Sequence, residues 1–254
     1  MNQYTTNAIN IRSYNLSEAD KIVVMYSKEQ GIIRCVAKGI KKTNSKLGGR
    51  MDLLIANKLL LSKGRNLDII CQAEGVDNFK ELRQDITKLS YAIYCAELIE
   101  HFGMENDSNS EKIYSLFFNL LKNMSSAQGD NVVIILVLNF QLKLMEYTGY
   151  AVELDNCVRC NDRINDEMFV FCHESGGIVC SSCKRQLYRH TQFTPEMRSL
   201  LHEAQCFDTT SLRGGLQPDT FTMLLCFNVL KNYIAERSHK KFKSADMIES
   251  LCRV

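Results

Sequence analysis

The sequence predicts an α+β protein in which a small amino-terminal β-barrel precedes a helical part that carries a four-cysteine insertion. Residues 8–74 form short β-rich runs separated by turn signals. From residue 78 onward the apolar residues follow the three-to-four spacing of a buried helix face. Two Cys-x-x-Cys pairs lie between residues 157 and 183. We therefore expect a barrel domain at residues 1–77, a helical domain at 78–254 and the insertion at about 153–190.

Five strands are expected in the amino-terminal part, at residues 8–14, 21–27, 32–37, 53–61 and 67–73. The tight connection before the last strand contains Gly64, which can supply a positive φ. Five strands in so short a segment favour a closed barrel, because closure removes exposed strand edges. A five-stranded Greek-key barrel of this size is the OB-fold, which in many proteins binds oligonucleotides.

The remaining chain predicts a bundle of helices, at residues 78–102, 111–124, 131–148, from Pro195 to about 204, 219–237 and 244–252. Gly103 ends the first of these helices, and Thr194 provides the N-cap before Pro195. The run at 132–138 is apolar on all sides, so we expect it at the centre of the bundle.

Composition places the chain among folded proteins of the cytoplasm. It has 254 residues, of which 45% are hydrophobic and 24% are charged, and this balance excludes disordered and fibrous classes. The amino terminus lacks the pattern of a secretory signal, and the apolar run at 132–138 is too short to cross a bilayer. We expect a cytoplasmic protein without membrane contact.

Eleven cysteines are present, which is a high but odd number. Seven are scattered singly, and a disulfide scaffold does not have this distribution. In a reducing compartment the simplest role for the single cysteines is that of small buried hydrophobic residues. The seven are Cys35, Cys71, Cys95, Cys172, Cys206, Cys226 and Cys252.

The other four, Cys157, Cys160, Cys180 and Cys183, have the two-knuckle spacing of a four-cysteine zinc site. Asn161 tolerates the left-handed turn of a knuckle, and a hairpin of residues 168–171 and 176–179 brings the pairs together. A chance arrangement, a redox-active Cys-x-x-Cys, and ligation by Cys172 or His173 are the alternatives. Because four thiolates leave no open coordination position, one bound Zn²⁺ is expected to be structural rather than catalytic.

Positive charge is concentrated towards the amino terminus. Residues 1–80 contain 13 Lys and Arg against 7 Asp and Glu, whereas the remaining chain is net acidic. Between Glu29 and Asp52 there is no acidic residue, and such a segment attracts phosphate. Tyr14 and Tyr26 are possible base-stacking platforms, although packing in the barrel is the more ordinary role of strand tyrosines. The alternative for the segment is a solvated loop that is basic for solubility.

No catalytic constellation is evident. The five histidines are dispersed, neither a nucleophile-elbow nor a phosphate-loop motif occurs, and no acidic set indicates a two-metal nuclease. We therefore expect a protein that is not an enzyme.

Several stretches, in order, resemble the bacterial RecO family of DNA repair proteins: Ala8-Ile-Asn-Ile-Arg12, Glu18-Ala-Asp-Lys-Ile22, Val36-Ala-Lys-Gly-Ile40, Ser62-Lys-Gly-Arg65, Gln72-Ala-Glu74, Gly149-Tyr150, Gly176-Gly177 with the cysteine pairs, and Phe242-Lys-Ser244. The resemblance implies an OB-fold followed by a helical domain with a zinc-finger insertion. It implies binding of single- and double-stranded DNA, annealing of strands coated with single-stranded DNA-binding protein, and loading of RecA together with RecR.

The resemblance and the charge pattern together give a set of expected DNA-contacting residues. These are Arg12, Arg34, Lys38, Lys41, Lys42, Lys46, Arg50, Lys63 and Arg65. On this hypothesis the protein is a non-enzymatic, nucleoid-associated mediator whose helical domain docks protein partners. A zinc-containing adaptor that does not touch DNA, an RNA-binding OB-fold protein and a zinc-ribbon nuclease are the rival hypotheses.

Overall fold

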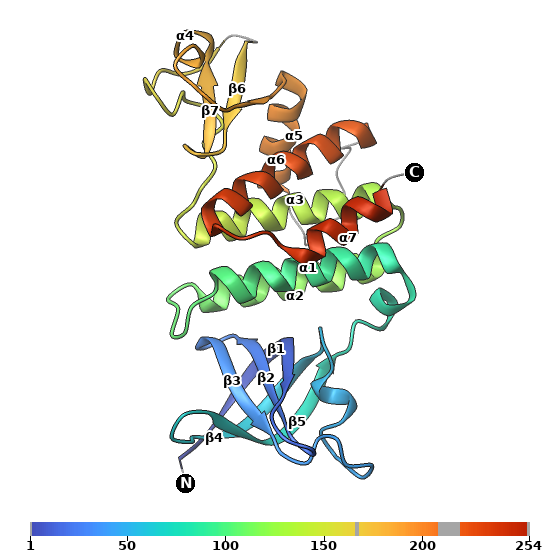
Figure 1. Ribbon diagram of the computed structural model, residues 1–254. Coiled ribbons are helices and arrows are strands. Elements are labelled where there is room, and N and C mark those ends of the chain that lie inside the picture. Colours follow the sequence, from blue (N-terminus) through green and yellow to red (C-terminus); the bar gives the residue numbers. More distant parts are fainter. Residues whose placement is uncertain (1, 166–167, 208–218, 253–254) are drawn as a thin grey trace. The chain divides into compact units, whose positions relative to one another are not determined.

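The structure, a computed structural model, describes residues 2–165, 168–207 and 219–252. An amino-terminal barrel, helices and a small inserted sheet confirm the α+β class (Figure 1). Contacts divide the chain into two compact units, Met1–Ser125 and Ser126–Arg253, and each is described by itself. The expected domain boundary between residues 77 and 78 stays a prediction.

The barrel consists of five strands closed in the order β1-β2-β3-β5-β4. β1 pairs antiparallel with both β2 and β4, and β3 pairs parallel with β5. This is the connectivity of the OB-fold, as the sequence predicts. The strands are β1 (Gln3–Asn15), β2 (Lys21–Ser27), β3 (Gly31–Ala37), β4 (Ala56–Ser62) and β5 (Asp68–Asp77).

Alternate residues of each strand fill the barrel. Val23 and Met25 of β2, and Leu59 and Leu61 of β4, are at most 1% exposed and belong to one apolar cluster. This period of two directs the intervening side chains away from the barrel interior, although in β2 those of Val24 and Tyr26 are buried as well. Met51 closes the interior from the β3–β4 connection, where a short 3₁₀ helix, η1 (Gly49–Met51), interrupts the loop.

Four expectations about the barrel are wrong, and one of them is the end of β5, which lies at Asp77 rather than at residue 73. β1 begins at Gln3 rather than residue 8, because its polar first residues pair with β4. β4 begins at Ala56 rather than residue 53, since Leu54 has φ of 59° and lies outside the strand. Gly64 does not adopt positive φ. Glycine is required there for space, because a Cβ would lie 2.0 Å from the Leu67 carbonyl oxygen.

Two α-helices follow the barrel in the amino-terminal unit, α1 (Ile86–Phe102) and α2 (Ser110–Ser126). The single helix expected from residue 78 is broken, and a 3₁₀ helix, η2 (Lys80–Gln84), precedes α1. Asp85 caps α1 by accepting hydrogen bonds from the backbone N–H groups of Thr87 and Lys88 at 2.9 and 3.1 Å. Asp85 itself has extended backbone, so a helix cannot continue through this residue, and α1 starts only after it.

The carboxyl-terminal unit is built on α3 (Asp130–Tyr147), α5 (Pro195–Cys206), α6 (Thr220–Ser238) and α7 (Lys243–Cys252). α3 packs against both α5 and α6, which confirms the expected central position of its apolar run. The buried Asn139 amide on α3 donates to the Ala204 carbonyl at the end of α5, at 2.8 Å. Within the described residues, no helix combines the length and hydropathy that a bilayer crossing requires.

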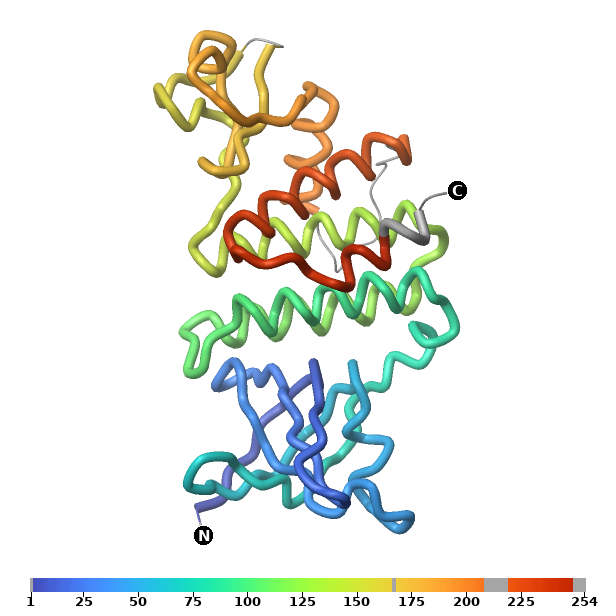
Figure 2. The backbone as a smooth tube through the Cα atoms, viewed as in Figure 1, coloured from blue at the N-terminus to red at the C-terminus, as the bar shows by residue number. Residues whose placement is uncertain are grey.

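The insertion lies between α3 and α5, in the yellow and orange part of the tube in Figure 2. It contains β6 (Phe169–Cys172), β7 (Gly177–Cys180), α4 (Ser181–Lys184) and β8 (Thr191–Gln192), with the strands in the order β7-β6-β8. We call this inserted part, residues 153–192, the cysteine module.

The scattered cysteines are buried only in part. Burial is confirmed for four of them, namely Cys35, Cys95, Cys172 and Cys226. Cys71 and Cys206 are exposed, so the prediction is wrong at these two positions. The side chain of Cys252 lies outside the described residues.

Candidate metal centre and nucleic-acid interface

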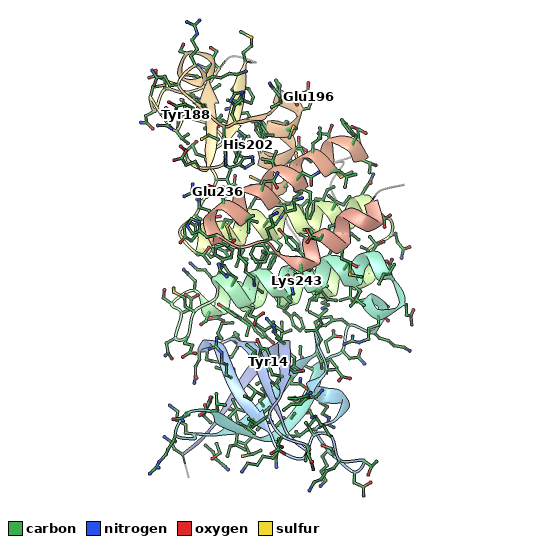
Figure 3. All side chains as sticks on the ribbon, viewed as in Figure 1. Tyr14, Tyr188, Glu196, His202, Glu236 and Lys243 are labelled. Atoms are coloured by element: carbon green, nitrogen blue, oxygen red, sulfur yellow. The ribbon has the colours of Figure 1, made fainter. Side chains whose placement is uncertain are left out.

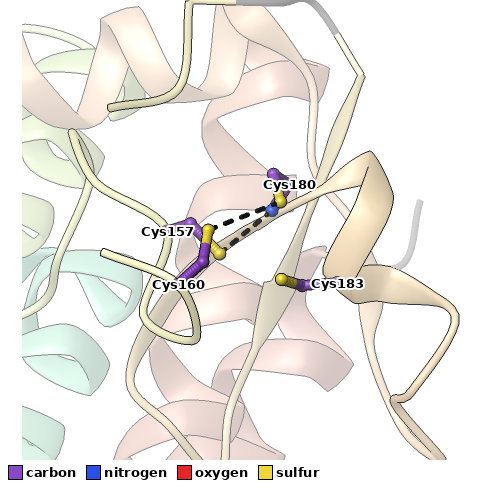
Figure 4. A group of neighbouring side chains, drawn as sticks. All are labelled: Cys157, Cys160, Cys180 and Cys183. Atoms are coloured by element: carbon purple, nitrogen blue, oxygen red, sulfur yellow. Dashed lines mark hydrogen bonds between the residues drawn. The ribbon is translucent and has the colours of Figure 1, made fainter. Parts of the chain in front are cut away.

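The fold brings the two Cys-x-x-Cys pairs together. The four sulfur atoms of Cys157, Cys160, Cys180 and Cys183 all lie within 4.8 Å of one another (Figure 4). The Cys160 and Cys180 sulfurs are 3.9 Å apart. Sulfurs bound tetrahedrally to one zinc ion at about 2.3 Å are about 3.8 Å apart, so the spacing of this pair suits such a site.

The first knuckle is a tight turn between Cys157 and Asp162. The Cys157 N–H donates to the Asp162 carbonyl, and the Asn161 N–H donates to the Cys157 carbonyl, both at 2.8 Å. Asn161 has φ of 63°, the left-handed conformation expected from the sequence. The turn therefore directs both thiols of the pair to the same side.

The second knuckle starts where β7 ends. The backbone N–H of Cys180 donates to the Cys157 sulfur at 3.4 Å, and α4 carries Cys183 one turn later. The β6–β7 turn needs its glycines, since Gly176 has φ of +74° and a Cβ on Gly177 would lie 2.6 Å from the Glu153 carbonyl oxygen. The β6–β7 hairpin thus places Cys180 and Cys183 next to Cys157 and Cys160.

The thiols of the quartet differ in acidity. Burial raises the pKa of Cys157, but hydrogen bonds from the backbone of Cys160, Cys180 and Arg159 outweigh burial and lower the pKa to about 6. A backbone hydrogen bond at Asp162 lowers the pKa of Cys160, but its side-chain hydrogen bonds and burial raise it to about 12. Without a metal, the site therefore favours the thiolate form of Cys157 and disfavours the thiolate form of Cys160.

A bound metal cation would overcome the unfavourable ionisation of Cys160, because it stabilises all four thiolates at once. The donor set is sulfur alone, which suits zinc, and it fills a tetrahedral shell completely. The residues thus fit a closed metal site.

Neither of the alternative ligands joins the quartet. The Cys172 thiol is buried and contacts the Ser175 hydroxyl at 3.5 Å, and His173 Nε2 hydrogen-bonds to the Thr191 hydroxyl at 2.8 Å. Among the described residues, the four cysteines form the one cluster of metal-binding type.

Side chains from α5 and α6 hold the cysteine module. The Arg198 guanidinium on α5 donates to the Ile164 carbonyl at 3.0 Å. On α6, Arg237 donates to the His173 carbonyl of the module at 3.0 Å, and the Tyr233 hydroxyl donates at 2.9 Å to the Tyr150 carbonyl, which lies in the segment that leads into the module. The module is therefore fixed within the carboxyl-terminal unit by backbone contacts as well as by its own sheet.

The strongest candidate for a nucleic-acid interface is the β3–β4 connection at residues 38–50, which we call the basic segment. Its apolar side chains Ile40 and Leu47, with the adjacent Met51, pack against the barrel interior. The Asn10 amide donates to the carbonyls of Arg50 and Asp52, both at 2.9 Å. The segment is therefore anchored from within while its lysines face solvent.

The start of the basic segment is attached to the β1–β2 loop. The Gly39 N–H donates to the Asp20 carboxylate at 2.7 Å, and the Lys41 ammonium donates to the Ser17 carbonyl at 3.0 Å. Lys38, Lys42 and Lys46 are exposed. The structure thus presents the lysines on an ordered loop, which reduces the entropy lost when they bind a ligand.

A groove of about 450 Å³ lies beside the basic segment on the outer surface of the barrel. Lys46 and Arg50 line it from the segment, and Lys58 lines it from β4. The Arg50 guanidinium also donates to the Ala73 carbonyl on β5. Sequence reasoning missed Lys58, although its position between the buried Asn57 and Leu59 is the signal that it faces outward.

Two expected DNA-contacting residues, Arg12 and Arg34, are ion-paired. Arg12 lies 2.9 Å from the Glu100 carboxylate of α1, and Arg34 contacts Glu105. Arg12 lies on β1 and Arg34 on β3, and both carboxylates reduce the charge that these strands offer to phosphate. Tyr26 is fully buried, so its role is packing, the more ordinary of the two that the sequence offers, and it is not a stacking platform.

Lys63 and Arg65 lie in the exposed β4–β5 turn. The Lys63 ammonium sits 5.9 Å from the centre of the Tyr4 ring. The turn borders a separate hollow that Arg34 and Asn66 line. The structure therefore does not bring Lys63 and Arg65 into the groove beside the basic segment.

Comparison with known proteins gives a consistent result over the whole chain. The family model described as Recombination protein O N terminal matches residues 1–79, and the one described as Recombination protein O C terminal matches residues 83–246. The chain is 28% identical to the DNA repair protein RecO of Desulforamulus reducens over 254 residues, covering 99% of this chain and 96% of that protein. It is 35% identical to RecO of Pelotomaculum thermopropionicum over 183 residues, covering 72% and 69%.

Proposed function

Because the chain belongs to the RecO family, we propose that it is a DNA repair and recombination mediator that binds DNA through its OB-fold barrel. In this role it binds single- and double-stranded DNA and anneals complementary strands coated with single-stranded DNA-binding protein. Together with RecR it promotes the loading of RecA. Such work takes place at the chromosome in the cytoplasm and needs no catalytic residue.

The observation that carries the proposal is the basic segment, in which apolar anchors fix the backbone while Lys38, Lys42 and Lys46 face solvent. Phosphate contacts of this kind position a strand without reading its sequence. A mediator has to act on any broken or gapped DNA, so binding that ignores sequence suits the role. The bases stay accessible for pairing with a second strand.

The metal belongs to the same proposal. We take the ion of the cysteine quartet to be Zn²⁺, held by Cys157, Cys160, Cys180 and Cys183. Its contribution is to stabilise the fold of the cysteine module, because a full shell of four thiolates leaves no position for water or substrate. The module then serves as a rigid part of the carboxyl-terminal unit, where protein partners dock.

The test is annealing of complementary oligonucleotides that have been precoated with single-stranded DNA-binding protein. We expect the protein to accelerate duplex formation, and the triple variant Lys41→Ala/Lys42→Ala/Lys46→Ala to lose most of this effect. A matched control, Lys80→Ala/Lys122→Ala/Arg163→Ala, removes three positive charges from exposed positions elsewhere. The control should anneal like the unaltered protein.

Two results would count against the proposal. The first is annealing by the basic-segment variant at the unaltered rate, and the second is an equal loss in the control, which would indicate a general effect of net charge. Circular dichroism of both variants checks that the fold is retained, since all six positions are exposed.

A further inference from the structure

Two stretches of the carboxyl-terminal unit combine several basic residues with a complete lack of acidic residues. One lies between Glu174 and Glu196, and the other between Glu236 and Asp246. The first stretch carries Lys184, Arg185 and Arg189, and the second carries Arg237, Lys240, Lys241 and Lys243. Each stretch alone is unremarkable, since basic surface residues are common.

The fold places these stretches on the two sides of one cleft of about 790 Å³. Residues 186–189 and Thr191 of the cysteine module line one side, and the end of α6 with residues 239–241 lines the other. We call it the basic cleft. Its charged lining consists of four cations and two carboxylates, namely Arg159, Arg189, Lys240, Lys241, Glu174 and Glu236. The lining is therefore net positive, whereas residues 126–253 as a whole contain 14 Lys and Arg against 15 Asp and Glu.

The cleft also carries an aromatic ring with no packing role. Tyr188 lies in its lining and is fully exposed, and Figure 3 shows it on the cysteine module. Leaving a large aromatic side chain entirely in water forgoes the stabilisation that burial gives. A ring held in this way next to cations is the arrangement by which proteins bind single strands, with the aromatic face on a base and the cations on phosphates.

We propose that the basic cleft is a second binding site for a single DNA strand, in which Arg189, Lys240 and Lys241 contact phosphates and Tyr188 stacks on a base. The proposal rests on the proposed function, since it takes DNA as the ligand. It deepens that function, because a protein that anneals strands gains from holding two of them. An acidic peptide would satisfy the cations but would give the exposed ring no π-stacking partner.

The chain contains no tryptophan, so a single Tyr188→Trp substitution creates a reporter located in the cleft. Stacking of a base on the indole quenches its fluorescence, and we expect quenching by oligo(dT) that added salt reverses. The quenching should persist when Lys41, Lys42 and Lys46 are replaced by Ala, because those residues belong to the other site. Phe221→Trp, at an exposed position that does not line the cleft, is the matched control and should show no quenching.

Two further variants measure the contributions of the cations and of the aromatic ring in the cleft. Both are made in the protein in which Lys41, Lys42 and Lys46 are replaced by Ala. Arg189→Ala/Lys240→Ala/Lys241→Ala in the reporter protein should make the log–log salt slope of binding less negative by about 2. Tyr188→Ala should lower the affinity for labelled oligo(dT), measured by anisotropy, by about 5- to 150-fold.

The outcomes separate this proposal from the one on which it rests. If labelled oligo(dT) does not bind the unaltered protein at all, the proposed function fails and the cleft proposal fails with it. If the oligonucleotide binds but the reporter tryptophan does not respond, the cleft proposal alone is overturned. A reporter that responds to oligoglutamate and not to oligo(dT) also overturns it, and assigns the cleft to an acidic peptide.

Discussion

The ion pairs of the barrel lead to a quantitative prediction about salt. Arg12 and Arg34 are paired with carboxylates, whereas Lys42 and Lys46 are exposed on the basic segment. If the five cations of that segment each neutralise one phosphate, single-strand affinity falls with a log–log slope of about −3.5, or about 100-fold between about 50 and about 200 mM salt. Lys42→Ala/Lys46→Ala should bring the slope to about −2 and the loss to about 20-fold.

Arg12→Ala/Arg34→Ala removes the same number of charges and serves as the comparison. Each arginine has to leave its carboxylate before it meets a phosphate, and the freed carboxylate then lies beside the polyanion. The slope of this variant should therefore stay near that of the unaltered protein. Anisotropy of labelled oligo(dT) across a salt series measures all three slopes. Equal slopes for the two double variants would refute the assignment of DNA contact to the unpaired cations.

Three other predictions test the anchoring of the basic segment, the chemistry of the cysteine quartet and the exposure of single thiols. Met51→Ala leaves a cavity in the barrel, so urea unfolding should show a loss of about 2–5 kcal/mol, and DNA affinity should fall as the segment loosens. Zinc uptake at about pH 7.5 should release at least two protons, because the pKa values of Cys160 and Cys183 are raised, and calorimetry in buffers of different ionisation enthalpy measures this. A brief maleimide pulse on the zinc-loaded protein, mapped by mass spectrometry, should label the exposed Cys71 and Cys206 ahead of the buried Cys35.

Local sequence signals predict much of this structure because they act over a few residues. The strand at Lys21–Ser27 and the helix that Thr194 caps are found where alternation and capping chemistry place them. The cysteine quartet was predictable from spacing, since two residues between thiols already define a knuckle. Asn161 in the left-handed conformation follows from the same local geometry.

Features that depend on distant partners were not predictable. The polar start of β1 has no alternation of its own and becomes a strand by pairing with β4, as Gln3 does with Ser62. The neutralisation of Arg12 depends on Glu100, which lies on a helix far along the chain. The basic cleft is lined by residues near 188 and by residues near 240, which are far apart in the sequence. A net charge taken over the whole helical part does not reveal this local positive charge.

The cysteine quartet is joined through the chain to one wall of the proposed basic cleft. α4 starts at the second knuckle, and the N–H groups of Gln186 and Leu187 donate to the carbonyls of Cys183 and Lys184 at 3.1 and 3.0 Å. The segment that carries Tyr188 therefore takes its position from the metal-binding turn. The barrel lies in the other unit and has a core of its own.

Removal of zinc by a chelator should for this reason abolish the quenching of a tryptophan reporter at position 188, while oligo(dT) still binds through the basic segment. The physical cause is local, because loss of the metal releases the turn that holds one wall of the cleft. Equal loss of both signals would mean that the metal stabilises the whole chain and does not act on the cleft alone. Unchanged quenching without metal would mean that the hydrogen bonds of Arg198 and Arg237 suffice to hold the module in place.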